Sequence, residues 1–445
     1  MLRQFAQAGV EVRVDPRIDT SVLASFRGVV LDDALESLLE PYDYFLTWTM
    51  LPGPLGRIPK LKQIQVFMPG SPAAARPINR GPFRFDTSRG VAGTSPEFVK
   101  NELLVGVRPG TTYARFQHLL DQIGGMIVNV DAASGIYLIR FPYGSNVEAL
   151  LAQLTRNPIV AHAELNYVSR LPPGTAATLA AEAGARLPAV TPPADGSVPV
   201  AVLDSGLDPS AGLSSVVSAA WNAVDPSQSL TDPVGHGTQM TLLASGLAAA
   251  DGTAADSILP VVAVGAFDAD GKTSNFAILQ ALAYAAQAGA KVVNMSWGSE
   301  TDSDFMRTAM QLAADNGLIL VAAAGNSPTG EPVYPAAYSS VLAVGGVTAD
   351  GQAWTGSNYG DFVSLSAPAT ATLPVGSNGS AGTYVGTSIS SAVAANALAD
   401  YVNRHPDATA DEVWNALRSV LSPAPAAGYG AGILDDAALQ RFLSL

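Results

Sequence analysis

The clearest hydrophobic pattern lies in the C-terminal half of the chain, where short, nearly uninterrupted apolar runs alternate with amphipathic segments. The runs have the length of strands that are buried on both faces, and the amphipathic segments have the length of helices. Strands are expected at 198–204, 258–267, 291–297, 318–326 and 341–347, and helices at 275–289, 302–317 and 388–402. This alternation predicts an α/β domain with a doubly wound parallel sheet, whose chemistry lies at the carboxyl ends of the strands.

A second pattern covers residues 99–171, where strand-like alternation and helical periodicity follow each other in the order strand, helix, strand, strand, helix, strand. Gly124 is expected to end the first helix, and Asn146 is expected to cap the second. This order of elements predicts a split βαβ sandwich, which is a ferredoxin-like α+β domain.

The N-terminal block, 1–70, has a strand-like run at 10–16, an amphipathic helical pattern within 29–42 and a further strand-like run at 64–68. The helical stripe consists of Leu31, Ala34, Leu35, Leu38 and Leu39. We expect a small α+β accessory domain, and its pattern "VVLDDALESLL" resembles the short N-terminal domain of secretins and TonB-dependent proteins.

Two stretches rich in Pro, Ala and Gly are expected to be linkers, at 71–98 and 172–196. They divide the chain into the N-terminal domain (1–70), the α+β domain (99–171) and the α/β domain (197–445).

Composition narrows the classes of function. Hydrophobic residues make up 48% and charged residues 14% of the 445 positions, as in a globular protein, and the net charge of −14 argues against a nucleic-acid partner. There is no cysteine, so disulfides and thiolate metal sites are excluded. The longest uncharged run, between Asp361 and Asp400, is interrupted by prolines and glycines, so we expect no membrane span. The first ten residues lack the apolar core of a leader peptide.

Four polar residues lie where a parallel sheet places its chemistry. Asp204 ends the first strand of the α/β domain, His236 begins the apolar helix in "DPVGHGTQM", Asn326 ends another strand, and Ser388 opens the helix at 388–402. Each residue alone is readily explained as a cap or turn residue. Their joint occurrence at strand and helix ends favours catalysis.

The segments "VAVLDSG", "GHGTQMTLLASG", "VVNMSWGS", "VAAAGNS" and "GTSISSAVAANALA" resemble the successive signature segments of subtilisin-like serine peptidases. The resemblance covers nearly all of 197–445, and residues 99–171 are similar to the family's inhibitor-type propeptide. It implies a serine endopeptidase in which Ser388 is the nucleophile and His236 is the general base. Asp204 would orient the imidazole, and Asn326 with the Ser388 N–H would bind the oxyanion.

The resemblance also implies where the residue before the scissile bond binds. The walls of that pocket would be Ser296, Trp297 and Gly298 on one side and a second strand end that includes Ala324 and Gly325 on the other. Val333 would form the floor, and Trp297 would crowd the groove, so we expect preference for small residues. The family's usual calcium loop is shortened to "GLAAADGTAADS", and we expect neither a metal nor a cofactor.

The expected partners are a polypeptide substrate and the chain's own prodomain, which would hold the enzyme as an autoinhibited zymogen. The segment 169–173, "SRLPP", would lie across the active site as a plug; we call it the plug segment. A periplasmic, cell-surface or extracellular location in a bacterium is expected. The alternative is a catalytically silent protein of this fold that serves as a binding or scaffold protein of the cell envelope.

Overall fold

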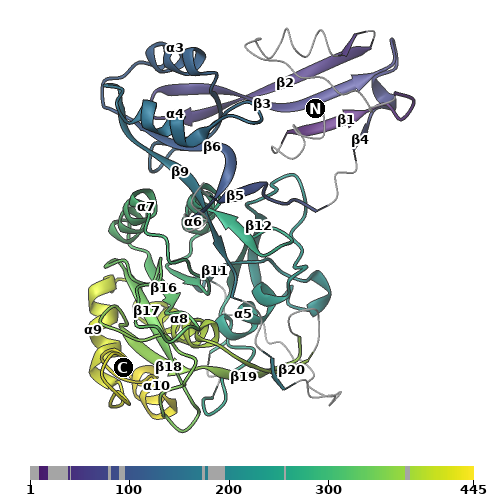
Figure 1. Cartoon of the computed structure of the whole chain (residues 1–445). Coiled ribbons are helices and arrows are strands. Elements are labelled where there is room, and N and C mark those ends of the chain that lie inside the picture. The colour runs from purple at the N-terminus through teal and green to yellow at the C-terminus, as the bar shows by residue number, and fades with distance from the viewer. Residues whose placement is uncertain are drawn as a thin grey trace. The chain divides into compact units, whose positions relative to one another are not determined.

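The computed structural model describes residues 10–18, 39–40, 42–78, 82–89, 96–172, 176–178, 196–254, 257–375 and 381–445. The chain forms two compact units (Figure 1). The first is Met1–Asn166 with Asp225–Ser227, and the second is Tyr167–Val224 with Gln228–Leu445. Each unit is described by itself.

The first unit begins with a four-stranded sheet in the order β2-β3-β1-β4. Its strands are β1 (Glu11–Val14), β2 (Asp43–Gly53), β3 (Gly56–Phe67) and β4 (Arg76–Pro77), with a 3₁₀ turn, η1 (Pro72–Ala74), before β4. β1 lies within the strand-like run expected at 10–16. β4 lies within the expected linker 71–98. The long hairpin of β2 and β3 was not expected, except for its end at 64–67. Four of the five residues in the predicted helical stripe, Leu31 to Leu38, lie outside the described part of the chain. Only Leu39 is described.

The rest of the first unit contains the split βαβ sandwich that the sequence predicts. Its elements are β6 (Glu97–Val107), α3 (Tyr113–Ile123), β7 (Met126–Asp131), β8 (Ile136–Arg140), α4 (Val147–Leu154) and β9 (Val160–Arg170). The last residues of β9, from Tyr167 on, belong to the second unit. The sheet order β9-β6-β8-β7 is that of a ferredoxin-like domain. Gly124 ends α3 in the left-handed conformation (φ 71°), and the Asn146 side chain accepts from the Ala149 N–H to cap α4. β5 (Thr87–Arg89), also within the expected linker, pairs with β6.

The second unit is built on the predicted parallel sheet, in the order β12-β13-β11-β15-β16-β17-β18. The strands are β11 (Val200–Asp204), β12 (Val217–Asn222), β13 (Val261–Gly265), β15 (Val292–Met295), β16 (Ile319–Ala323), β17 (Val341–Val347) and β18 (Leu365–Pro368). The helices are α5 (His236–Ala244), α6 (Asn275–Gln287), α7 (Asp304–Asp315), α8 (Thr387–Arg404), α9 (Ala410–Val420) and α10 (Asp436–Leu443); a 3₁₀ turn, η2 (Pro209–Ala211), follows β11.

Burial along β11 shows why this sheet is covered on both faces. Val200 and Val202 belong to one buried cluster with residues of α5 and α8. Ala201 and Leu203 belong to another with residues of α6 and α7. Because successive side chains of a strand point to opposite faces, a strand with apolar residues at every position needs helices on both sides.

A smaller antiparallel sheet lies beside α8. It consists of β10 (Ala176–Thr178), β19 (Thr370–Leu373) and β20 (Gly382–Val385), in the order β10-β20-β19. β20 runs directly into α8 (Figure 1). β14 (Lys272–Ser274) pairs antiparallel with Val168–Arg170, the end of β9.

Within the described residues, no helix combines the length and the apolar character needed to cross a bilayer.

Candidate active site

The candidate residues are held by two strand ends and two helix starts of the second unit. Asp204 is the last residue of β11, Asn326 follows the end of β16, His236 begins α5, and Ser388 is the second residue of α8. His236, Asn326 and Ser388 line one pocket. The carboxyl edge of the parallel sheet thus brings together residues that are far apart in the sequence.

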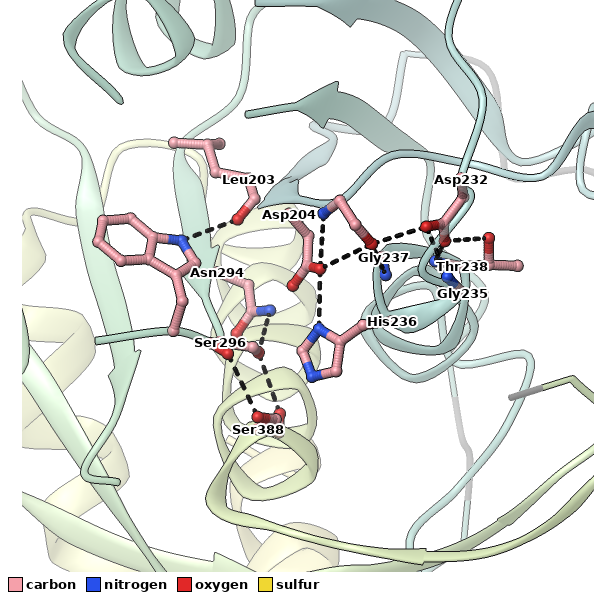
Figure 2. Close-up of polar contacts among 12 residues, drawn as sticks. Leu203, Asp204, Asp232, Gly235, His236, Gly237, Thr238, Asn294, Ser296 and Ser388 are labelled. Carbon is pink, nitrogen blue, oxygen red and sulfur yellow. Dashed lines mark hydrogen bonds and ion pairs between the residues drawn. The ribbon is translucent and has the colours of Figure 1, made fainter. Parts of the chain in front are cut away.

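Asp204 and His236 form a direct, buried pair. The distance from His236 Nδ1 to Asp204 Oδ1 is 2.8 Å. His236 is 6% exposed and Asp204 is 1% exposed. Burial opposes the charged imidazolium, but the Asp204 carboxylate outweighs it, and Asp232 adds to the effect, so the pKa of His236 is raised above its ordinary value. With its Nδ1 proton held by Asp204, the ring leaves Nε2 to act as a base on the side of Ser388 (Figure 2).

The hydroxyl of Ser388 is turned toward a backbone acceptor. It donates to the Ser296 carbonyl at 3.2 Å, and Ser388 is 4% exposed. The hydroxyl must therefore leave this acceptor before it can donate to His236. Catalytic hydrogen bonds often tighten only when substrate is bound.

The two glycines around His236 have separate structural reasons. Gly235, before the helix, adopts a left-handed conformation with φ 84°. Gly237 lies against the turn after Asp204, where a Cβ atom would come within 2.3 Å of the Gly206 carbonyl oxygen. The turn and the helix can approach closely enough for the Asp204–His236 contact only because position 237 has no side chain.

Asp232 organises this approach and was missed by the sequence analysis. One carboxylate oxygen accepts from the Ser205 hydroxyl and the Gly235 N–H, both at 2.7 Å. The other accepts from the Thr238 N–H at 2.7 Å and its hydroxyl at 2.6 Å (Figure 2). Asp232 therefore ties the start of the His236 helix to the turn that follows Asp204. An acidic residue just before a helix start was the available signal.

Asn326 is oriented by the residue before the serine. Its Oδ1 accepts from the Thr387 N–H at 2.9 Å and from the Thr387 hydroxyl at 2.8 Å, which leaves the amide NH₂ group on the other side. The Ser388 N–H lies in the first turn of α8, where helix N–H groups lack intrahelical acceptors. These two donors are available for an oxyanion.

A buried network of hydrogen bonds holds the backbone carbonyl of Ser388. Ser296, expected as a pocket wall, is fully buried, and its hydroxyl donates to the Ser388 carbonyl at 3.1 Å. The Asn294 amide donates to the Ser296 hydroxyl at 2.8 Å, and the Ser391 hydroxyl lies 3.0 Å from it. The side chain of Ser296 therefore supports the first turn of α8, and only its backbone can form part of a pocket wall.

Val333 lies between the two expected walls of the specificity pocket. A Cβ atom on Gly298 would come within 2.5 Å of Val333 Cγ1, and one on Gly325 would lie 3.4 Å from Val333 Cγ2. The neighbouring wall residue Ala324 accepts at its carbonyl from the Asn358 amide at 3.2 Å. The valine methyl groups therefore occupy the space between the glycines.

Trp297 is 3% exposed, and its indole N–H donates to the Leu203 carbonyl at 2.9 Å. It belongs to the same buried cluster as Leu171 of the plug segment. Its effect on the groove stays a prediction.

The site is occupied by the chain itself. Arg170 forms an antiparallel bridge with Gly298, and the Leu171 N–H donates to the Gly271 carbonyl at 3.0 Å. Pro172 lines the pocket that contains His236 and Ser388. For residues 170–172, the expectation that the plug segment lies across the active site is confirmed.

In the described part of the chain, no three His, Asp or Glu side chains are grouped closely enough to hold a metal ion. The expectation of no cofactor stays a prediction.

The fold and this combination of residues are typical of the serine peptidases that are built on a parallel α/β sheet. The subtilase family matches residues 195–432, more than half of the chain, and the fervidolysin N-terminal prodomain matches residues 87–166. The chain therefore belongs to the subtilase family and carries a prodomain before its α/β domain.

Individual relatives agree with this assignment. The minor extracellular protease Epr of Bacillus subtilis (strain 168) is 33% identical over 246 residues, which are 54% of this chain and 38% of that protein. The thermophilic serine proteinase of Bacillus sp. (strain AK1) is 31% identical over 245 residues, 50% of this chain and 58% of that protein. The chain thus spans less than two thirds of either. The subtilisin of Bacillus pumilus is 30% identical over 250 residues, which are 54% of this chain and 89% of that protein.

The fold is similar to the crystal structure of fervidolysin from Fervidobacterium pennivorans, described as a keratinolytic enzyme related to subtilisin. The TM-score is 0.60 at 18% identity, with 78% of this chain and 61% of that chain covered.

Replacing Asp232 by asparagine should move the acid limb of the pH–activity profile to lower pH by roughly 0.5 to 1 unit. His236 must be neutral to accept a proton, and Asp232 helps to raise its pKa, so removing the charge lets the imidazole deprotonate at lower pH. Profiles of kcat/KM against pH on the activated enzyme measure the shift. The control is Thr238→Val, which removes one hydrogen bond to Asp232 but keeps the charge. An unmoved limb in Asp232→Asn, or equal shifts in both variants, would contradict the electrostatic role.

Proposed function

We propose that this chain is a serine endopeptidase that is made as an autoinhibited zymogen. The observation that carries the proposal is the buried contact of 2.8 Å between Asp204 and His236, beside a serine at the start of α8. Membership of the subtilase family and the prodomain support it. The names of the relatives include an extracellular protease, so we place this enzyme outside the cytoplasm of a bacterium, without choosing a compartment.

In the proposed mechanism, Ser388 Oγ attacks the carbonyl carbon of the scissile bond while His236 Nε2 takes the hydroxyl proton. The Asp204 carboxylate stabilises the imidazolium that forms. The oxyanion is bound by the Asn326 amide and the Ser388 N–H, and the imidazolium then protonates the leaving amine as the C–N bond breaks. Water, deprotonated by the same imidazole, hydrolyses the acyl-enzyme and restores the Ser388 hydroxyl.

Ser388→Ala should abolish peptide hydrolysis and change the free energy of unfolding by about 1 kcal/mol or less, because one weak hydrogen bond to the Ser296 carbonyl is lost. Hydrolysis assays and denaturant melts measure the two effects. A fluorophosphonate probe should label the processed wild-type enzyme and not the variant. Equal activity in the two proteins would end the assignment of the nucleophile. An unlabelled wild type would favour the silent binding or scaffold protein of the cell envelope.

The enzyme should prefer Ala, Ser, Gly or Val before the scissile bond over Phe, Tyr or Arg, by roughly 1–3 kcal/mol in transition-state binding. Val333 fills the space between Gly298 and Gly325 that a large side chain requires. Peptide-library profiling measures the preference. Val333→Gly should raise cleavage after Phe selectively, and the matched Val341→Ala, a buried core change in β17, should not. A wild-type profile dominated by aromatic residues would refute the proposal.

Self-processing should fall between Gly174 and Leu187 rather than next to Pro172 and Pro173. Pro172 lines the catalytic pocket, yet proline has no N–H to donate to the groove and its φ is restricted. Apart from 176–178, the expected range lies outside the described residues. N-terminal sequencing of the active species tests this proposal. A mature terminus at Leu171, Pro172 or Pro173, or an active enzyme with an unbroken chain, would disprove it.

A further inference from the structure

Asn358 is a fully buried residue whose side chain hydrogen-bonds to a wall of the expected specificity pocket. It lies in the connection between β17 and β18. Its amide donates to the Ala324 carbonyl at 3.2 Å and to the Glu331 carbonyl at 2.9 Å. Its Oδ1 accepts from the Gly330 N–H at 3.0 Å. A carboxamide has two N–H donors and one carbonyl, so this side chain is engaged at both ends and in one orientation only.

These bonds close the loop that leads from the pocket wall to the pocket floor. One of them holds the wall residue Ala324, and the other two hold the segment 330–331, which is followed closely by Val333. The Asn358 backbone N–H adds a fourth bond, to the Gly325 carbonyl at 2.9 Å. Both ends of the loop are therefore fastened to a single residue.

Asn358 is itself attached to the parallel sheet. Its carbonyl accepts from the Ser357 hydroxyl at 2.8 Å, and the Gly346 N–H of β17 donates to the same hydroxyl oxygen at 2.8 Å. Ser357 is also fully buried. The amide therefore projects from a fixed base, and its position sets the separation between the two ends of the loop.

The chain after the floor residue has a separate attachment. Ser299 and Tyr334 exchange two backbone hydrogen bonds of 2.8 Å, which hold the residue after Val333 beside the other wall. The position of Val333 relative to Gly325 is then set from the side of Asn358. A Cβ atom on Gly325 would lie 3.4 Å from Val333 Cγ2, so the valine lies directly beside this wall.

We infer that Asn358 is a positioning residue that determines specificity without touching the substrate. It holds the Gly325 wall and the Val333 floor at a separation that admits a small side chain before the scissile bond and excludes a large one. The floor cannot give way to a large side chain, because each carbonyl or N–H left unpaired in the interior costs free energy. This inference rests on the proposed peptidase function and adds a determinant of its substrate class.

The first test is Asn358→Asp in the enzyme processed from the full-length chain, assayed on two peptides that differ only in Ala or Phe before the scissile bond. Aspartate has nearly the same shape but at most one hydrogen to donate, so at least one of the two carbonyls loses its partner. We expect the ratio of kcat/KM for the Ala peptide to that for the Phe peptide to fall roughly tenfold. An unchanged ratio would overturn the inference. If the wild type cleaves neither peptide, the proposed peptidase is refuted instead, and a wild type that prefers Phe refutes the proposed specificity.

The matched control is Asn403→Asp. The Asn403 amide donates to the Val198 carbonyl at 3.1 Å and the Ala399 carbonyl at 2.9 Å, and its Oδ1 accepts from the Val198 N–H at 2.6 Å. It lies near the end of α8, where the helical rise places it about 22 Å from Ser388. This variant should lose stability in denaturant melts and keep the wild-type ratio. Equal changes of the ratio in both variants would show that lost stability, and not positioning, is the cause.

The second test asks whether Asn358 acts through Val333. In a Val333→Gly background the floor no longer excludes a large side chain, so adding Asn358→Asp should change the ratio by less than about threefold. Fully additive effects of the two substitutions would contradict the inference, because a residue that acts through another is not independent of it. If Asn358→Asp does not fold, Asn358→Ser, which keeps one hydroxyl donor, is assayed in both backgrounds and judged by the same outcomes.

Discussion

The contact between Asp204 and His236 is the interaction on which the rest of the site depends. It joins a strand end to a helix start, and both partners are almost completely buried, so neither water nor mobile side chains can replace a missing partner. The contact requires Gly237 to lack a side chain, because the helix start lies against Gly206. It also requires Asp232 to hold the helix start and the Ser205 turn together. Several residues with no chemical role therefore have a geometric one.

Much of the second unit could be predicted from sequence because its strands are buried on both faces. β11 is apolar up to its last residue, Asp204, and β16 is apolar throughout, with Asn326 shortly after its end, so the strand ends point to both residues. Two C-terminal helices were not expected, although Thr409 and Glu412 form a capping box at the start of α9. The role of Asp232 could not be read from spacing alone, since its partners Ser205 and Thr238 come from separate elements.

The N-terminal hairpin shows where hydrophobic patterning fails. β2 and β3 contain prolines, among them Pro52 and Pro59, and β2 exposes Phe45, Trp48 and Met50. Apolar and polar residue types do not alternate regularly along either strand, and a register shift between Thr47 and Trp48 changes which positions of β2 share a face. The short strands β4, β5 and β10 are likewise held by backbone pairing, which leaves little trace in side-chain composition.

The close packing of Val333 against Gly298 also bears on how this pocket can change over generations of mutation. While valine stays at 333, almost any replacement of Gly298 creates a clash with its side chain. We therefore expect substitutions at 298 to be destabilising and to be removed by selection. Once 333 becomes smaller, the nearest remaining atom to a new Cβ at 298 is the Tyr334 carbonyl oxygen at 3.3 Å, which a slight adjustment accommodates. The order of substitutions therefore matters: a route to a new pocket that begins at 333 is open, and the reverse route passes through a poorly packed protein.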